Sequence, residues 1–246
     1  MSIAENFEII ADAVYEKGRQ DEYDAFWDIY QNKGKRINYQ NGFAGKGWND
    51  TTFNPKYNLI VVGNAGAMFQ ETELKDLVGI LNKKGKILDT SQVTTFQNMF
   101  YYSYFLTSVP TINTLGTADN STITGTFSYC KKLKTIELIL KDNGSQSFSN
   151  TFNRCFALEN LVIEGKIGQN GFNVKDSVNL TRDSILSILK ALSLDITANK
   201  SITFNEVHQS IIENDEECKK YWEAAKKKEN SEDPGWTFAY AKEATS

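Results

Sequence analysis

Few residues in this chain could do chemistry. The 246 residues include one histidine, His208, and three cysteines, Cys130, Cys155 and Cys218. A catalytic triad needs a nucleophile, a base and an orienting acid, and no serine or cysteine motif surrounds His208. Zinc and calcium sites need clustered ligands, and the cysteines are too widely spaced for a zinc knuckle. The sequence therefore predicts no catalytic residue, no metal site and no cofactor.

Paired carboxylates are the one catalytic arrangement that the sequence leaves open. A glycosidase needs only two acids, and the chain has 31 Asp and Glu residues. The sequence does not show which acids meet, and we expect no deep pocket in a repeat protein of this size. A carbohydrate-active enzyme is kept as a remote alternative to a non-enzymatic protein.

Composition excludes several classes of protein. The chain is 40% hydrophobic, which is too much for a disordered chain. Its net charge of -4 argues against nucleic acid as a partner. We expect the lysine clusters, among them Lys131 and Lys132, to be solvated, and exposed sites such as Lys131 to tolerate substitution. No apolar stretch approaches the ~18 residues of a membrane span, and no signal peptide pattern is visible.

An internal repeat governs the expected architecture. Phenylalanines at 69, 100, 127 and 152 are 31, 27 and 25 residues apart. The segment 126–138 aligns on 151–163 without a gap, and 99–109 matches both with a serine in place of cysteine. No single unit can bury its Phe and Leu residues alone, so we expect the units to stack and to form a continuous core.

Spacing within the repeat predicts its local structure. The Phe, +3 and +6 positions have helical spacing, which predicts a short helical turn, and positions +9 and +11 alternate like a strand. Cys130 and Cys155 occupy equivalent positions and are expected to be small buried hydrophobes. A disulfide between neighbouring repeats stays open.

The flanks differ from the repeats. Apolar spacing predicts two helices before Gly34, followed by an aromatic, glycine-rich stretch that packs as a satellite core or, alternatively, stacks on sugars or a partner. Strands are predicted at 59–62, 87–88, 201–204 and 236–240. Thr181 and Asn205 are expected to cap helices. The predicted division is an N-terminal helical and aromatic cap (1–58), repeats (59–175) and a C-terminal α+β cap (176–246).

Polar and aromatic side chains of the repeats are the remaining candidates for function. Tyrosine and asparagine make adaptable stacking and hydrogen-bonding contacts in binding loops. We take five of these as candidate surface binding residues: Tyr101, Tyr102, Tyr104, Asn150 and Asn153.

The repeat Thr-Phe-x-x-Cys-x-x-Leu-x-x-Ile/Leu, in 126–138 and 151–163, resembles the BspA-like class of leucine-rich repeats. This resemblance covers roughly residues 64–165 and implies a curved solenoid that serves adhesion and protein binding without catalysis. The predicted fold class is thus an α+β leucine-rich-repeat (BspA-like) solenoid with helical N- and C-terminal caps.

The flanking segments 15–31, Phe43–Trp48, Phe53–Tyr57, 180–186 and 235–238 resemble the lead-in and closing segments of repeat proteins found in tailed phages and prophages of gut bacteria. Surface-anchored BspA-like proteins carry an export signal and a wall anchor, and this chain shows neither, which argues against a bacterial cell-surface role.

These resemblances imply a non-enzymatic virion structural or adhesion protein, on the tail, baseplate or capsid exterior. It would assemble in the host cytoplasm and bind other virion proteins, or a protein or glycan of the host surface. Neither nucleic acid nor membrane insertion is expected, and homo-oligomerisation stays open. The alternative is an intracellular bacterial or prophage-derived protein-interaction scaffold located in the cytoplasm.

Overall fold

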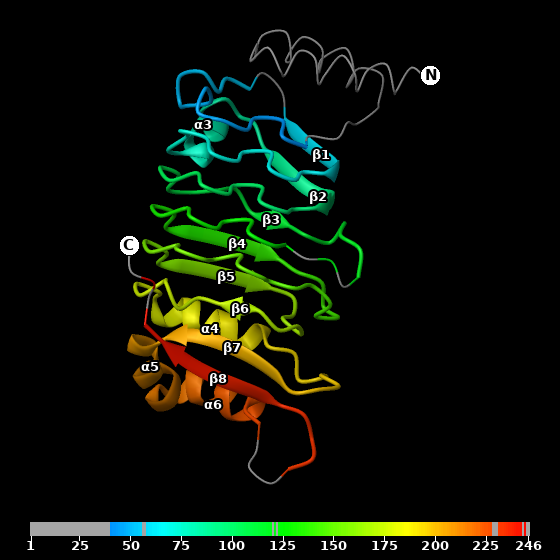
Figure 1. Cartoon of the computed structure of the whole chain (residues 1–246), viewed down its shortest axis with the longest axis vertical. Coiled ribbons are helices and arrows are strands. Elements are labelled where there is room, and N and C mark those ends of the chain that lie inside the picture. The colour runs from blue at the N-terminus through cyan, green and yellow to red at the C-terminus, as the bar shows by residue number, and fades with distance from the viewer. Residues whose placement is uncertain are drawn as a thin grey trace.

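The structure, a computed structural model, describes residues 40–55, 58–119, 121, 123–227, 231–242 and 244. Its strands follow one another along the longest axis of the molecule (Figure 1). The two helices predicted before Gly34 and the aromatic residues Tyr39 and Tyr57 lie outside the described residues.

The described strands form three small parallel sheets. β1 pairs with β2, β3 with β4 and β4 with β5, and β6 with β7 and β7 with β8. The elements are β1 (Leu59–Asn64), α3 (Leu77–Lys83), β2 (Leu88–Thr95), β3 (Ile112–Asn113), β4 (Thr135–Ile139), β5 (Asn160–Glu164), β6 (Phe172–Asn173), α4 (Arg182–Ala191), β7 (Lys200–Asn205), the 3₁₀ turn η1 (Glu206–His208), α5 (Gln209–Asn214), α6 (Glu216–Ala225) and β8 (Trp236–Ala241).

The predicted fold class, an α+β leucine-rich-repeat solenoid with helical caps, is wrong. That fold requires the strands to form one ladder, and the structure divides them into three sheets. Helices also fall between parallel strands, with α3 between β1 and β2 and α4 between β6 and β7. The described architecture is therefore a weakly mixed α/β arrangement of small parallel sheets.

A threonine side chain separates the first sheet from the second. The Asn113 amide of β3 donates to Thr90 Oγ1 at 2.8 Å, and that hydroxyl donates to the Asn113 carbonyl at 3.1 Å. The side chain of β2 thus takes the place that its backbone would hold in a continuous ladder.

A helix covers the free edge of β5. The Leu161 amide donates to Ser184 Oγ and the Ile163 amide to Ser187 Oγ, both at 2.9 Å. These serines lie on α4, which packs against β5. Because two hydroxyls satisfy the edge amides, the second sheet ends there without another strand.

The register predicted for the last two repeat copies is confirmed. β4 pairs with β5 residue for residue at the repeat spacing, from Thr135–Asn160 to Ile139–Glu164. The earlier copy differs, because its strand begins at Ile112 rather than at Val109. Pro110 lies between these positions and has no N–H to donate to a ladder.

The expected stacking of the repeat phenylalanines is also confirmed. Ring centroids lie 5.3 Å apart for Phe69 and Phe100, 5.7 Å for Phe100 and Phe127, and 6.1 Å for Phe127 and Phe152. The interplanar angles are at most 14°, and all four side chains are buried. These rings form the central row of the core.

The predicted helical turns are wrong, because the chain forms consecutive β-turns at these positions. Residues two before and two after each stacked ring have positive φ, as at Asn98 (59°) and Tyr102 (60°) around Phe100. A right-handed helix cannot include such residues. A β-turn and a helix both bring residues three apart together, so the spacing alone does not distinguish them.

Peptide hydrogen bonds join each turn to the next. The amides of Phe69, Phe100 and Phe127 donate to the carbonyls of Met99, Thr126 and Thr151 at 2.7, 2.8 and 3.1 Å. Buried peptide groups need such partners, so each turn satisfies the polar backbone of its neighbour.

The cysteines belong to this interior, as predicted. Cys130 Sγ donates to the Phe100 carbonyl and Cys155 Sγ to the Phe127 carbonyl, both at 3.1 Å. Both thiols are free and fully buried, and burial raises the pKa of each. Ser103 donates to the Phe69 carbonyl at 2.6 Å in the equivalent position, so the repeat uses a small donor there.

The described aromatic residues before β1 form the predicted satellite core. Phe43, Trp48 and Phe53 are buried and lie edge to face. Phe43 stacks on Phe69 with ring centroids 5.3 Å apart, which extends the central row by one ring. Their burial argues against the alternative in which these rings stack on a ligand.

Helices accompany the last strands, and two of the predicted caps are confirmed. Thr181 accepts from the Ser184 amide at the start of α4, and Asn205 accepts from the Val207 amide at the start of η1. α5 and α6 lie beside β7 and β8 (Figure 1).

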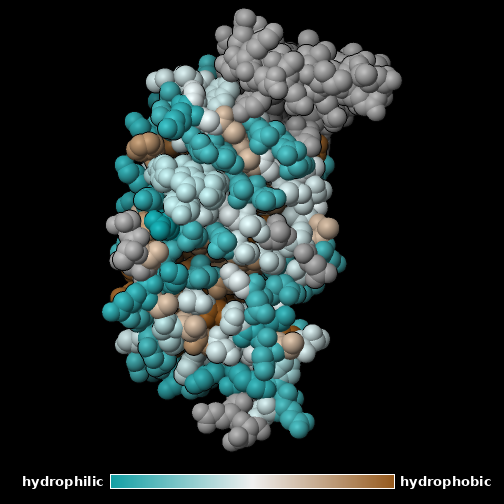
Figure 2. All heavy atoms as spheres, viewed as in Figure 1, coloured by the Kyte–Doolittle hydropathy of each residue, from teal (hydrophilic) through white to brown (hydrophobic). Residues whose placement is uncertain are grey.

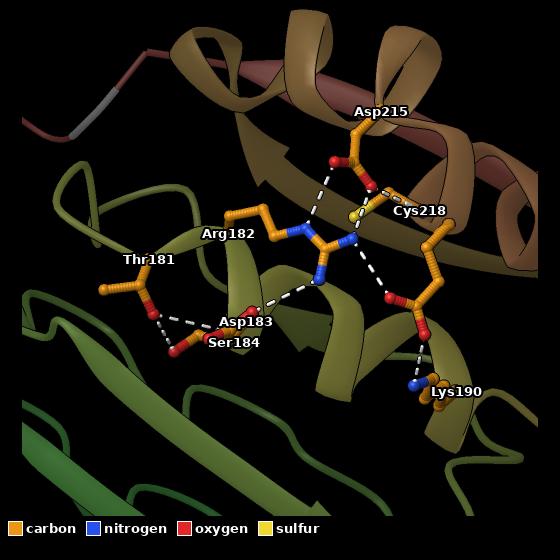
Figure 3. Close-up of polar contacts among 8 residues, drawn as sticks. Thr181, Arg182, Asp183, Ser184, Lys190, Asp215 and Cys218 are labelled. Carbon is orange, nitrogen blue, oxygen red and sulfur yellow. Dashed lines mark hydrogen bonds and ion pairs between the residues drawn. The ribbon is translucent and has the colours of Figure 1, made fainter.

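An ion-pair network joins α4 to α6 (Figure 3). Arg182 donates from Nε and Nη2 to the two carboxylate oxygens of Asp215 at 3.1 and 2.9 Å, and from Nη2 to Glu217 at 3.0 Å. Glu217 also pairs with Lys190 at 2.7 Å. The hydrogen bonds from Arg182 hold the pKa of Asp215 well below its usual range.

Replacing either central ring should destabilise the protein strongly. We expect Phe127→Ala and Phe152→Ala each to lower the free energy of unfolding by about 3–5 kcal/mol, since each removes a buried aromatic side chain. Urea unfolding followed by circular dichroism measures this. The control is Val162→Ala on β5, where the side chain is 52% exposed and the cost should be about 0.5 kcal/mol or less. Equal costs at the buried and exposed positions would contradict the stacked core.

The Asp215 carboxylate should make the free energy of unfolding fall at acidic pH. Its folded pKa lies below the unfolded value of about 3.9, so the native state binds fewer protons and its advantage is lost as pH falls below about 4. Asp215→Asn keeps an oxygen to accept from the Cys218 amide that caps α6 but removes the charge. Urea unfolding between pH 2 and 7 measures the effect. As pH falls, the free energy of unfolding should decrease less for this variant than for the wild type.

Asp142→Asn, at an exposed turn, serves as the control for this pH dependence. It should follow the wild-type pH dependence. If Asp215→Asn loses as much unfolding free energy at acidic pH as the wild type, the ion pair does not form in solution.

Candidate functional site

The β-turns place one repeat position on the outside of the stack. The residues two positions after the stacked phenylalanines 69, 100, 127 and 152 are Glu71, Tyr102, Tyr129 and Arg154. All four have φ between 58° and 65°. The same turn geometry therefore presents an acid, two tyrosines and an arginine in a row.

Aromatic rings gather around this row. Tyr102 and Tyr129 stack with centroids 4.2 Å apart and planes at 10°. Tyr101 and Tyr104 each lie edge-on to Tyr102, at 4.4 and 5.2 Å. With Phe105 and Phe156 these four residues form what we call the aromatic face. Tyr104 and Phe105 are 37% and 42% exposed, so a partner can reach the rings.

Cations cover part of the aromatic face. The Lys131 ammonium lies 5.7 Å from the Tyr104 ring centroid and 5.8 Å from that of Phe156. Lys132 lies 5.1 Å from Phe105, and the Arg154 guanidinium 5.1 Å from Tyr129. Lys132 is exposed and Lys131 half-buried, so the structure agrees with the expectation that these lysines are solvated and adds that their ammonium groups lie near rings.

An open pocket, partly lined by exposed side chains, lies at the edge of the aromatic face. Its volume is about 510 Å³, within the usual range for ligand sites. It is lined by Lys46, Glu71, Thr72, Glu73, Tyr102, Tyr104 and Phe105. Burial, followed by the nearby Tyr102, Tyr129 and Glu71, raises the pKa of the Tyr104 phenol. The pocket thus combines rings, two carboxylates and an ammonium group.

Asn150 and Asn153 lie in a second, smaller hollow of about 200 Å³. The buried Asp176 carboxylate also lines it and accepts from the Arg154 and Ala244 amides at 2.8 and 2.7 Å. The five residues predicted from the sequence are therefore divided between two places, three in the aromatic face and two in this polar hollow.

The sequence prediction missed several residues of the aromatic face and of the groups beside it. Tyr129 and Arg154 occupy the repeat position of Tyr102, so the alignment of the copies contained the signal for both. Glu71 occupies the same repeat position in the degraded first copy, so the alignment contained the signal for it too, whereas no pattern connected Lys46, which precedes the repeats, to the tyrosines.

The residues considered for chemistry lie elsewhere. His208 is buried, its Nε2 lies 3.3 Å from the Val178 carbonyl, and burial lowers its pKa. Within the described residues no group of three His, Cys, Asp or Glu side chains is placed to hold a metal ion. No described helix is long and apolar enough to cross a membrane.

Hydrophobic side chains are scattered on the surface shown in Figure 2, which is mostly hydrophilic or near neutral. Exposed aliphatic residues lie far apart in the sequence, on β5, on η1 and in three connecting segments: Ile87, Leu115, Val162, Leu194 and Val207. Single exposed residues of this kind need no functional explanation. The aromatic face and its pocket are therefore the best candidate for a binding site.

The left-handed backbone at Tyr129 should be detectable by substitution. Tyr129→Asn and Tyr129→Val both remove the ring, but asparagine tolerates φ near 65° and a β-branched side chain does not. We expect the valine variant to be less stable than the asparagine variant by about 1–2 kcal/mol. Urea unfolding of the two proteins measures the difference. Equal stabilities would contradict the turn geometry that presents the rings.

Comparison of the chain with protein-family models, with curated proteins and with solved structures finds no match. The resemblances to BspA-like repeats and to phage repeat proteins thus remain sequence-based expectations, and function is argued from the geometry of the aromatic face.

Proposed function

We propose that this chain is a non-enzymatic binding protein, a structural or adhesion component of a phage particle, and that the aromatic face is its binding surface. It would lie on the tail, baseplate or capsid exterior and contact other virion proteins or the host surface. The observation that carries the binding role is the cluster of partly exposed tyrosines, in which Tyr102 and Tyr129 stack and Tyr104 lies edge-on to Tyr102.

The geometry favours binding because the rings are held ready for contact. Tyrosine has few rotatable bonds, so ordering it on a partner costs little conformational entropy. The Tyr102 and Tyr129 amides donate to the Ser128 and Asn153 carbonyls at 3.0 and 2.8 Å, which fixes the backbone beneath both rings. Preorganised rings of this kind are typical of the centres of binding sites.

The placement in a phage particle rests on the flanking segments that resemble phage repeat proteins. Two of these segments, around Phe43–Trp48 and Phe53, pack against Phe69 of the central row. They are thus part of the unit that carries the aromatic face.

One observation favours a second function. Glu71 and Glu73 line the same ring-bordered pocket, and two carboxylates are what a carbohydrate-active enzyme requires. A reducing-sugar assay on a panel of glycans tests this directly, since hydrolysis releases new reducing ends.

Purified particles from the source should contain the chain. Mass spectrometry should detect it in a fixed ratio to the capsid protein, and particles made with the double variant Tyr102→Asn and Tyr129→Asn should lose the chain or adsorb more slowly to host cells. The asparagines keep the left-handed turns, so the fold is retained while both rings are removed.

Two outcomes would contradict the proposal. Absence of the chain from particles, together with pull-downs that recover only cytosolic host proteins, would favour the intracellular scaffold. Release of reducing ends by the purified chain would favour the enzyme. Ser149→Ala, in the polar hollow, is the matched control and should leave particle composition and adsorption unchanged.

A further inference from the structure

We infer that the pocket beside the aromatic face binds a neutral carbohydrate. This inference rests on the proposed binding function and names the ligand class of that same site. The pocket of about 510 Å³ draws its lining from three stretches of chain: Lys46 before β1, residues 71–73, and residues 102–105. It is therefore built from successive turns of the stack.

Two rings of the pocket lie at a right angle to each other. Tyr102 and Tyr104 have an interplanar angle of 90° and centroids 5.2 Å apart. The face of an aromatic ring carries partial negative charge, and the C–H groups on one side of a pyranose ring carry partial positive charge. A sugar can thus pack its C–H side on one ring and direct its hydroxyls toward the polar side of the pocket.

The polar lining can satisfy those hydroxyls. Glu71 and Glu73 accept hydrogen bonds and Lys46 donates them, and hydrogen bonds to charged groups are stronger than neutral ones. Gln70 Nε2 donates to Glu71 Oε1 at 3.0 Å, which orients that carboxylate. Among the described residues neither glutamate forms an ion pair, and nor does Lys46, so their charges are available to a ligand.

The charges select against ionic ligands. An anion would face the Glu71 and Glu73 carboxylates. A cation would be attracted by the two carboxylates but repelled by Lys46 and by Lys131 and Lys132, whose ammonium groups already lie near the rings. A hydroxyl-rich neutral molecule uses acceptors and donor together without repulsion from either, which is why a neutral glycan fits best.

The test uses the purified full chain and immobilised polysaccharides of three charge classes. The neutral probes are a mannan, a β-1,3-glucan and a galactan, within a wider array of neutral oligosaccharides. Alginate serves as the polyanion and chitosan as the polycation. We expect binding to at least one neutral probe and not to alginate or chitosan.

Variants locate the binding. Tyr102→Asn removes one ring and keeps the turn, and Glu73→Gln removes one charge; each should weaken binding to the neutral probe about tenfold. Ser149→Ala in the polar hollow should bind like the wild type. Circular dichroism and melting confirm that each variant is folded.

Three results would overturn the inference: binding only to alginate or chitosan, binding to no neutral probe, or neutral binding that both pocket variants leave unchanged. Each of these leaves the proposed function standing if the chain is found in particles, because the aromatic face could then bind a protein. Absence from particles with glycan binding intact would instead contradict the virion role alone.

Discussion

The peptide hydrogen bonds between successive turns are the interaction on which the rest of this structure depends. They run through a row of stacked phenylalanines, where water has no access and each peptide group needs a partner. Small side chains satisfy further buried carbonyls: the Thr126 and Thr151 hydroxyls donate to the Phe96 and Ile123 carbonyls at 3.0 Å. Cys130 and Cys155 serve the same purpose, which explains why their thiols are buried without forming a disulfide.

This arrangement also determines the surface. For a turn to hydrogen-bond with its neighbours on both sides, the chain adopts positive φ on either side of each buried ring, and the second of those residues points outward. Side chains at that position therefore align along the stack, and the particular residues there give an acidic end, an aromatic middle and a basic end. The binding surface is a consequence of how the core is built.

Sequence patterns predicted the interior better than the architecture. Gap-free alignment of two copies gave the register of β4 on β5, and apolar spacing identified the buried rings. The division into sheets was not predictable, because it depends on hydroxyls such as Ser184 and Thr90 that replace backbone partners. The site was found in part: Tyr101, Tyr102 and Tyr104 were adjacent in sequence, whereas Glu73 and Lys46 join them only through stacking.

Native-state hydrogen exchange of the turn amides tests the central claim, that successive turns form one fixed framework beneath the aromatic face. The account predicts that the amides of Phe100, Tyr102, Phe127 and Tyr129, which donate to the next turn, exchange only through global unfolding, with opening free energies that match the stability measured in denaturant. Exchange of the Tyr102 and Tyr129 amides through local openings, independent of denaturant, would contradict it, because the rings would then lack a rigid support.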